Sequence, residues 1–195
     1  MNIQLSMFAE EAIELMRDTE GGVCYYPARV PESLAAEWFS ALFPLVPWHG
    51  DRRPMYDRIV DVPRLMASVA LSDPDRPPCI DAALSAVQAV APAPYTHVGL
   101  NLYRDERDSV AMHNDRWHDL AVGRPISIFS LGAPRDMLIR PKQGGAGLRI
   151  TLAPGSVLVM SHALQRSHDH GIPKCAHAAG PRISLAFRVR SSGRR

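Results

Sequence analysis

The sequence is short of several features that would mark a particular class of protein. Its three cysteines, Cys24, Cys79 and Cys175, are odd in number and widely spaced, which excludes a disulfide framework and favours a reducing compartment. No apolar run approaches the length of a membrane span, and the first residues lack a basic segment followed by an apolar stretch. We therefore expect a cytoplasmic protein with neither a membrane span nor a secretory signal.

The sequence also has little net charge and no repetition. The formal net charge of +2 is too small to argue for nucleic-acid binding by itself, and the chain has no internal repeat or low-complexity segment. What is present is ordinary for a soluble globular domain: 195 residues, 46% apolar and 22% charged. The 17 prolines and 13 glycines fit many turns, and hence many short strands. We expect one domain, with a monomer as the default because nothing in the sequence fixes the oligomeric state.

The apolar periodicity predicts helices early in the chain and strands later. Residues 1–20 have a roughly helical pattern that fits a short helix or a loose arm, residues 23–26 fit a strand, and helices are expected from residue 32 and over 79–90. From Tyr95 onward the chain changes to short apolar runs separated by turns. These runs are residues 98–103, 126–131, 137–139, 148–152 and 157–160. Such spacing indicates a sandwich or barrel.

Residues 48–78 are polar and rich in proline. They predict a loop-rich stretch that forms a rim or lid over a site in the barrel. The segment contributes four arginines, Arg52, Arg53, Arg58 and Arg64.

A His-x-Asp triplet, His113 and Asp115, is the first candidate for a metal site. An extended backbone directs residues i and i+2 to the same side, so both side chains can face one ion. Two imidazoles and one carboxylate cover one face of an iron(II) ion and leave the opposite positions open. Three histidines, His162, His168 and His170, are available as the third ligand.

A structural zinc site is the competing interpretation of the same region. Its candidate ligands are His162, His168, His170, Cys175 and His177. Their spacings match no zinc-finger pattern, so a zinc site is the weaker hypothesis.

The segment from Arg182 to Arg188 alternates with a period of two. Ile183, Leu185 and Phe187 share one face, while both arginines lie on the other. At about 3.3 Å per residue, the two arginine backbones are roughly 20 Å apart, so inward side chains of ~6 Å could bracket a short dicarboxylate. Arginine suits this role because its planar fork binds carboxylate through two hydrogen bonds.

Four motifs occur in order: Asn-x-Tyr at Asn101, His-x-Asp at His113, His-Gly-Ile at His170 and Arg-x-Ser-x-x-Phe-Arg at Arg182. Together they resemble the AlkB-like family of iron(II)- and 2-oxoglutarate-dependent dioxygenases, best over residues 95–190 and more faintly back to about residue 21. The resemblance implies a mainly β, α+β fold, the double-stranded β-helix or jelly-roll barrel, with two or three supporting helices in the N-terminal half.

The resemblance also implies the roles of individual residues. His113, Asp115 and His170 would be the iron ligands, with His170 preferred because Gly171-Ile172-Pro173 follows it as in the family. Arg182 would bind the remote carboxylate of 2-oxoglutarate. The rest of that pocket would be formed by Asn101, Tyr103, Ser184 and Arg188. Residues 1–94 would supply helices and a substrate lid to a single domain, 1–195, whose catalytic core is 95–190.

The implied chemistry uses iron(II), 2-oxoglutarate and dioxygen to hydroxylate a C–H bond. If that carbon is bonded to nitrogen, the product loses an aldehyde, which is oxidative dealkylation. The leading hypothesis is dealkylation of nucleobases in single-stranded or damaged DNA or RNA. The alternatives are hydroxylation or demethylation of a small metabolite or protein side chain, and a jelly-roll protein that binds a metal or anion without turnover.

The chain departs from the family's nucleic-acid repair enzymes near the substrate. Those enzymes commonly have acidic residues after the His-x-Asp, where this chain has Arg116 and Trp117, and aromatics in the lid, where residues 68–70 are Ser-Val-Ala. Trp117 could stack on a planar substrate or be a half-buried structural residue. Arg64 and Arg116 are further candidates for substrate contact. Basic positions such as Arg135 and Arg190 fit a phosphate track or solvated surface charge equally well.

Overall fold

A computed structural model describes residues 11–55 and 58–191. Within them, the strands of the N-terminal half are β1 (Ile13–Met16), β2 (Val23–Tyr26), β3 (His49–Met55) and β4 (Arg58–Ala70). The later strands are β5 (His97–Tyr103), β6 (Val110–His113), β7 (Ile126–Gly132), β8 (Arg135–Pro141), β9 (Leu148–Leu152), β10 (Val157–Met160), β11 (His168–Ile172) and β12 (Arg182–Arg188). The helices are α1 (Glu32–Leu45), α2 (Pro78–Gln88), α3 (Leu164–Ser167) and the 3-10 turn η1 (Trp117–Asp119).

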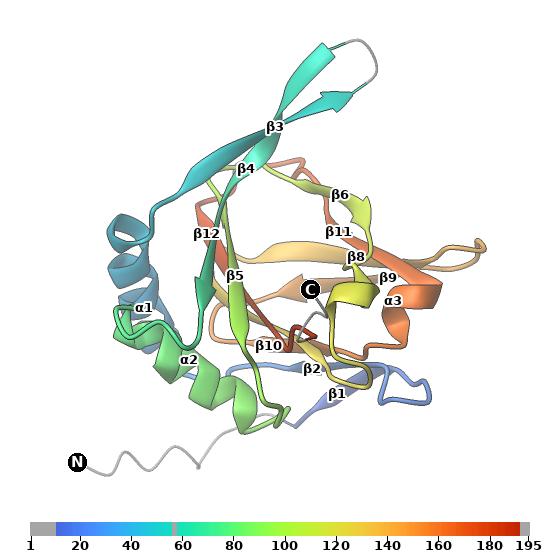
Figure 1. The fold of residues 1–195 in the computed structure, drawn as a ribbon. Helices are drawn as coiled ribbons and strands as arrows, with labels where there is room; N and C mark the ends of the chain where they lie inside the picture. The colour runs from blue at the N-terminus through green and yellow to red at the C-terminus, as the bar shows by residue number, and fades with distance from the viewer. Residues whose placement is uncertain (1–10, 56–57, 192–195) are drawn as a thin grey trace.

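The strands form two antiparallel sheets that face each other (Figure 1). The larger has eight strands in the order β1-β2-β10-β7-β12-β5-β4-β3, and the smaller has four in the order β6-β11-β8-β9. Strands that follow one another in sequence are thus often split between the sheets, as in a double-stranded β-helix. The predicted jelly-roll architecture is confirmed.

Strand β12 lies in the middle of the large sheet, and its alternation separates two environments. Ile183, Leu185 and Phe187 are fully buried in the apolar core that α1 and α2 cover. The opposite face presents Arg182 and Arg188 to the space between the sheets, in register with Tyr103 and His97 of β5. The period-two pattern therefore identified both the strand and its functional face.

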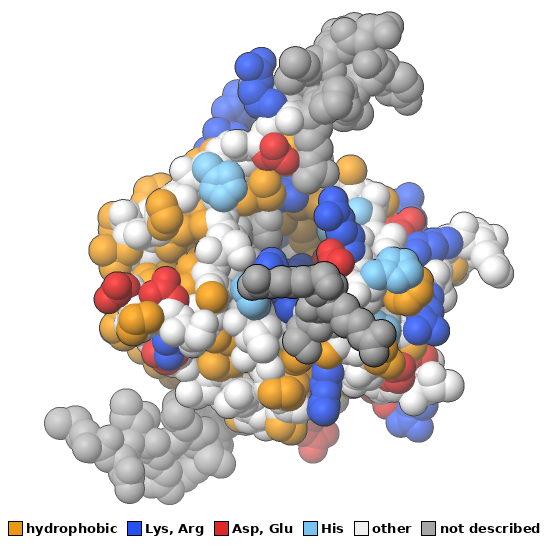
Figure 2. All heavy atoms as spheres, viewed as in Figure 1, with side chains coloured by type: hydrophobic (Ala, Val, Ile, Leu, Met, Phe, Trp, Pro, Cys, Tyr) orange, Lys and Arg blue, Asp and Glu red, His pale blue; other side chains and the backbone are white. Residues whose placement is uncertain are grey.

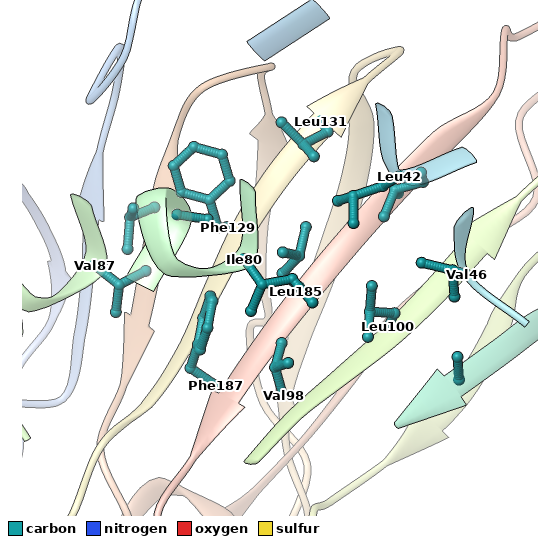
Figure 3. Packing of buried hydrophobic residues seen from close by; sticks show 14 of the residues in the cluster. Leu42, Val46, Ile80, Val87, Val98, Leu100, Phe129, Leu131, Leu185 and Phe187 are labelled. Carbon is teal, nitrogen blue, oxygen red and sulfur yellow. The ribbon is translucent and has the colours of Figure 1, made fainter. Parts of the chain in front are cut away.

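The two longer helices pack against the outer face of the large sheet (Figure 1). Leu42 of α1 and Ile80 of α2 are fully buried, and both belong to one apolar cluster with the sheet residues Phe129 and Leu185 (Figure 3). A buried Leu or Ile side chain contributes about 1.5–3 kcal/mol by leaving water. This core supports the sheet from behind. On the inner side, the polar side chains of the pocket lie beside a second apolar cluster that includes Ile128 and Met137.

The prediction of a loop-rich segment over residues 48–78 is wrong. Residues 49–55 and 58–70 form the paired strands β3 and β4, which lengthen the large sheet and project beyond the body of the protein (Figure 1). The prolines were misleading because Pro54 lies on the edge strand and Pro63 near a register shift, where a missing N–H is tolerated.

Two other expectations need correction. The possible helix over residues 1–20 lies partly outside the described residues, and residues 13–16 form strand β1, paired with β2. The short helix α3 was not anticipated from the sequence. Within the described ranges, no helix is both long and apolar enough to cross a membrane.

Candidate active site

Three side chains with metal-binding atoms meet between the sheets. His113 ends β6 and His170 lies directly opposite it on β11, so the antiparallel pairing brings the two imidazoles together, with ring centroids 4.6 Å apart. Asp115 follows β6, and the potential ligand atoms of all three residues lie within 4.8 Å of one another. Two nitrogens and one carboxylate oxygen at this spacing suit a single iron(II) ion.

Both imidazoles are prepared for metal binding by their surroundings. The Nδ1 of His113 is 2.9 Å from the backbone oxygen of Ala111, which can only accept, so Nδ1 carries the proton and Nε2 is free to ligate. Burial, with a smaller contribution from His113, lowers the pKa of His170 to about 4. The imidazole of His170 is therefore neutral at neutral pH, the form that can bind a metal ion.

Arg188 holds the carboxylate of Asp115 through two hydrogen bonds. Its Nε donates to Oδ2 at 2.8 Å and its Nη2 to Oδ1 at 3.1 Å. Burial alone would raise the pKa of Asp115, but Arg188 and the two histidines keep it below the usual value. The idea that Arg182 and Arg188 bracket the two ends of one dicarboxylate is not supported, because Arg188 already pairs with Asp115.

Arg182 is the candidate for carboxylate binding deeper in the pocket. It is 1% exposed, its Nη2 donates to Ser130 Oγ at 3.0 Å, and its Nε and Nη1 have no hydrogen-bond partner. Its guanidinium also lies 5.3 Å from the centroid of the buried Tyr103 ring. A buried cation with two nitrogens that lack hydrogen-bond partners favours an anion beside it, and both residues line the same hollow of about 260 Å³ as the metal cluster.

The remaining predicted pocket residues are connected by hydrogen bonds. Asn101 donates through Nδ2 to Ser184 Oγ (3.4 Å) and accepts from Arg64 Nε at its Oδ1 (2.8 Å). All three residues line the hollow. Arg64 was expected to contact substrate from the rim, whereas the structure places it in the pocket wall beside Asn101.

His168 does not belong to the metal cluster. It is half-buried, and its Nδ1 lies 2.8 Å from Ser167 Oγ. The histidine that lies with His113 and Asp115 is His170. Among the described residues, no second grouping of His, Cys, Asp or Glu side chains could hold a metal. This finding leaves no support for the zinc hypothesis, whose ligands all lie in the described part of the chain.

Two buried residues that no motif indicated support the loop that contains Asp115. Gln165 of α3 is completely buried, and its Oε1 accepts a hydrogen bond from the Asp115 N–H at 3.0 Å. His162, 1% exposed, places its Nε2 3.3 Å from the backbone oxygen of Trp117. Because these contacts join distant segments and belong to no short motif, only the fold reveals them.

Two other sequence-based candidates are placed differently from expectation. Trp117 is half-buried with its ring under the guanidinium of Arg166, 4.9 Å from the centroid, and it does not line the hollow. Arg135 is buried and donates to the backbone oxygens of Asp105, Asp108 and Pro173, so it supports loops and belongs to no phosphate track.

The remaining candidates lie toward the surface. Arg116 is exposed and lines a second hollow next to the first. Arg52 is exposed on β3, and the side chains of Arg53 and Arg58 lie outside the described part of the structure. Figure 2 shows a face that is hollowed near its centre, with basic side chains around the opening.

The family model described as the 2OG-Fe(II) oxygenase superfamily matches residues 22–188. The chain belongs to this superfamily. The oxygenase family uses iron(II), 2-oxoglutarate and dioxygen, and the His-Asp-His cluster and the unsatisfied Arg182 suit the first two of these.

Curated relatives of this oxygenase are AlkB homologues. The chain is 34% identical over 110 residues to the protein named DNA oxidative demethylase ALKBH2 of Homo sapiens, a match covering 52% of this chain and 42% of that protein. It is 29% identical over 154 residues to the alpha-ketoglutarate-dependent dioxygenase alkB homolog 3 of Mus musculus, covering 74% and 51%. The oxygenase thus spans about half the length of the curated relatives it matches.

A solved structure shares the fold. The structure of OsALKBH1 superposes with a TM-score of 0.57 at 14% identity, covering 86% of this chain and 96% of the other. The likeness independently supports the two-sheet jelly-roll architecture of the oxygenase.

Proposed function

We propose that this oxygenase removes alkyl groups from nucleobases in DNA or RNA by oxidative dealkylation, in a DNA-repair role. The observation that carries the chemistry is one pocket that holds both a His-Asp-His cluster and a buried arginine, two of whose nitrogens have no hydrogen-bond partner. The nucleobase substrate is supported by the printed names of the ALKBH2 relatives, which are DNA oxidative demethylases.

Each residue of the pocket has a specific task in this proposal. His113, Asp115 and His170 would hold iron(II), and Arg182 would bind the remote carboxylate of 2-oxoglutarate through its free Nε and Nη1. When bound, iron(II), 2-oxoglutarate and dioxygen supply the oxidising power that hydroxylates a carbon of the substrate. Arg188 keeps Asp115 ionised, so that this ligand stays an anion.

The surrounding residues complete the cosubstrate pocket. Tyr103 closes one side of the Arg182 guanidinium and, being 3% exposed, excludes water from it. Asn101 and Ser184 form a hydrogen-bonded wall with Arg64. Hydroxylation of an alkyl carbon bonded to a ring nitrogen lets the C–N bond break, with the aldehyde leaving and the proton returning to nitrogen.

One observation favours a second candidate function. The pocket wall on β4 includes the small residue Ser68, one of the three positions (68–70) where the family's repair enzymes commonly have aromatics that stack on a base. Hydroxylation of a small metabolite or protein side chain at the same metal site is therefore the alternative. A cytoplasmic location is part of the proposal and rests on the three free cysteines.

A substrate screen tests the two functions against each other. Alkylated oligonucleotides and a metabolite pool are incubated in parallel with the iron-loaded enzyme and 2-oxoglutarate, and products are identified by mass spectrometry. The proposal expects loss of the alkyl group from an oligonucleotide. Hydroxylated metabolites with all oligonucleotides intact would support the alternative instead.

A further inference from the structure

A second hollow opens directly beside the iron pocket. It has a volume of about 510 Å³ and is lined by Asp115, Arg116, Asp119, Leu120, Arg188, Arg190 and Ser191. Three of these residues, Asp115, Arg188 and Arg190, also line the iron pocket. The two spaces are therefore contiguous, and a substrate larger than the inner pocket can extend into the outer hollow, which we call the vestibule.

Backbone hydrogen bonds fix two walls of the vestibule. Leu120 and Arg190 form an isolated antiparallel bridge, the Ser191 N–H donates to the Asp119 oxygen at 3.0 Å, and the Ala121 N–H donates to the Val189 oxygen at 2.9 Å. These bonds join the chain after β12 to the loop that follows the His-x-Asp triplet. The vestibule is therefore held by the fold without a ligand.

The vestibule has an excess of positive charge. Arg188 and Asp115 neutralise each other, which leaves Arg116 and Arg190 against the single carboxylate of Asp119. Among the described residues, neither Arg116 nor Arg190 makes an ion pair or a side-chain hydrogen bond. Five other arginines with exposed side-chain surface form ion pairs with carboxylates (Arg17, Arg76, Arg104, Arg107 and Arg149), whereas Arg124, Arg140 and Arg166 form none with the described residues.

We propose that the vestibule binds a phosphate group of the nucleotide whose alkylated base lies at the iron, through Arg116 and Arg190. The proposal rests on the proposed function and extends it from a base to a nucleotide. Two arginines whose N–H groups are unused match the several oxygens of a phosphate. The carboxylates of 2-oxoglutarate are not the natural occupants, because Arg182 offers a buried partner deeper in the pocket.

The test compares substrates that share a base and differ in phosphate. Initial rates of formaldehyde release give kcat/KM for 1-methyladenosine, for its 5′- and 3′-monophosphates and for a short single-stranded oligonucleotide with one 1-methyladenine. The wild type should prefer at least one monophosphate over the nucleoside. A charge-assisted hydrogen bond at an exposed site supports a preference of about tenfold.

Removing the arginines should remove the preference. The ratio of kcat/KM for the preferred monophosphate to that for the nucleoside should fall by a factor of about three in Arg190→Gln, and should approach one when Arg116→Gln is added. Arg140→Gln is the matched control, because Arg140 is an exposed arginine of β8 that lines neither hollow. Its ratio should equal that of the wild type.

The affinity for an unmethylated single-stranded oligonucleotide is a second measurement, and it does not depend on turnover. Each lost phosphate contact should flatten the log–log salt dependence of binding by about 0.7, so Arg190→Gln should show a shallower slope than Arg140→Gln. Thermal unfolding of every variant establishes that it is folded.

The outcomes separate this proposal from the proposed function. If nucleoside and monophosphates react equally well in the wild type, or if Arg190→Gln and the double variant keep the wild-type ratio, the vestibule is not a phosphate site although dealkylation stands. If 2-oxoglutarate is consumed but no methylated nucleoside, nucleotide or oligonucleotide loses its methyl group, the proposed function fails. Preference for an acidic peptide substrate over all nucleotides would assign the vestibule to a protein partner and overturn the phosphate proposal.

Discussion

Gln165 Oε1 accepts a hydrogen bond from the backbone N–H of Asp115 at 3.0 Å, across 50 residues of sequence. The side chain is completely buried and its Nε2 has no hydrogen-bond partner, so the bond to Asp115 is the one hydrogen bond that this amide makes among the described residues. It therefore positions the loop that places Asp115 beside His113 and His170.

Loss of this hydrogen bond should loosen the metal site. Gln165→Met fills similar space without an acceptor, and outer contacts of this kind typically contribute about 10- to 100-fold to metal affinity. Titration with cobalt(II), followed by its visible absorption, should show weaker binding and an altered spectrum. Gln88→Met, at an exposed position of α2, is the control. An unchanged cobalt spectrum and affinity in Gln165→Met would show that Asp115 needs no such support.

Arg182→Ala should raise the 2-oxoglutarate requirement sharply. Removing one partner of a buried charge pair costs about 2–5 kcal/mol, which corresponds to affinity losses of tens- to thousands-fold. The apparent KM for 2-oxoglutarate measures this directly. Arg182→Lys should restore only part of the affinity, since an ammonium cannot reproduce the planar fork. Arg140→Ala should behave as wild type, and an equal KM in folded Arg182→Ala would remove Arg182 from the cosubstrate site.

Asp108 should make stability depend on acid pH. It is 3% exposed and accepts from the backbone N–H, the Nε and the Nη2 of Arg104 at 2.8, 2.8 and 2.9 Å. Burial alone would raise its pKa, but the bonds from Arg104 lower it below the usual value. Because the unfolded chain takes up the proton at higher pH, the stabilisation is complete above the unfolded pKa of 3.8 and is lost as the pH falls through the lower folded value.

Urea unfolding of Asp108→Asn measures this effect. We expect the free energy of unfolding to fall by about 1–3 kcal/mol at neutral pH, because the amide of Asn makes weaker hydrogen bonds to Arg104 than the carboxylate does. The gap between wild type and variant should narrow as the pH falls below 3.8, because the stabilisation by the Asp108 charge is lost on the way down to its lower folded pKa. Asp75→Asn, at an exposed position, is the control. A gap that is constant with pH would mean that the Asp108 charge does not stabilise the fold.

The parts of the fold that local patterns encode could be predicted from the sequence. Alternation identified β12 and assigned Arg182 and Ile183 to opposite faces, which the structure confirms. The same reasoning failed for β3 and β4, because Pro54 and Pro63 weaken the strand signal although an edge strand and a register shift tolerate them.

The candidate site was predictable only where a short motif carries it. His113, Asp115 and His170 were named from motifs, and the structure brings them together, although their role as iron ligands is still a prediction. The contacts that depend on chain topology could not be foreseen. The Gln165–Asp115 hydrogen bond joins segments that are 50 residues apart in sequence. The Arg188–Asp115 ion pair joins segments that are 73 residues apart.

The most direct test measures succinate and formaldehyde together, from a methylated single-stranded oligonucleotide incubated with iron(II), ascorbate and 2-oxoglutarate. We predict that the wild type forms both in equal amounts, that His170→Ala forms neither, and that His168→Ala retains much of both activities because His168 lies outside the ligand cluster. Succinate without formaldehyde from any oligonucleotide, or turnover that survives His170→Ala and is lost in His168→Ala, would contradict the account.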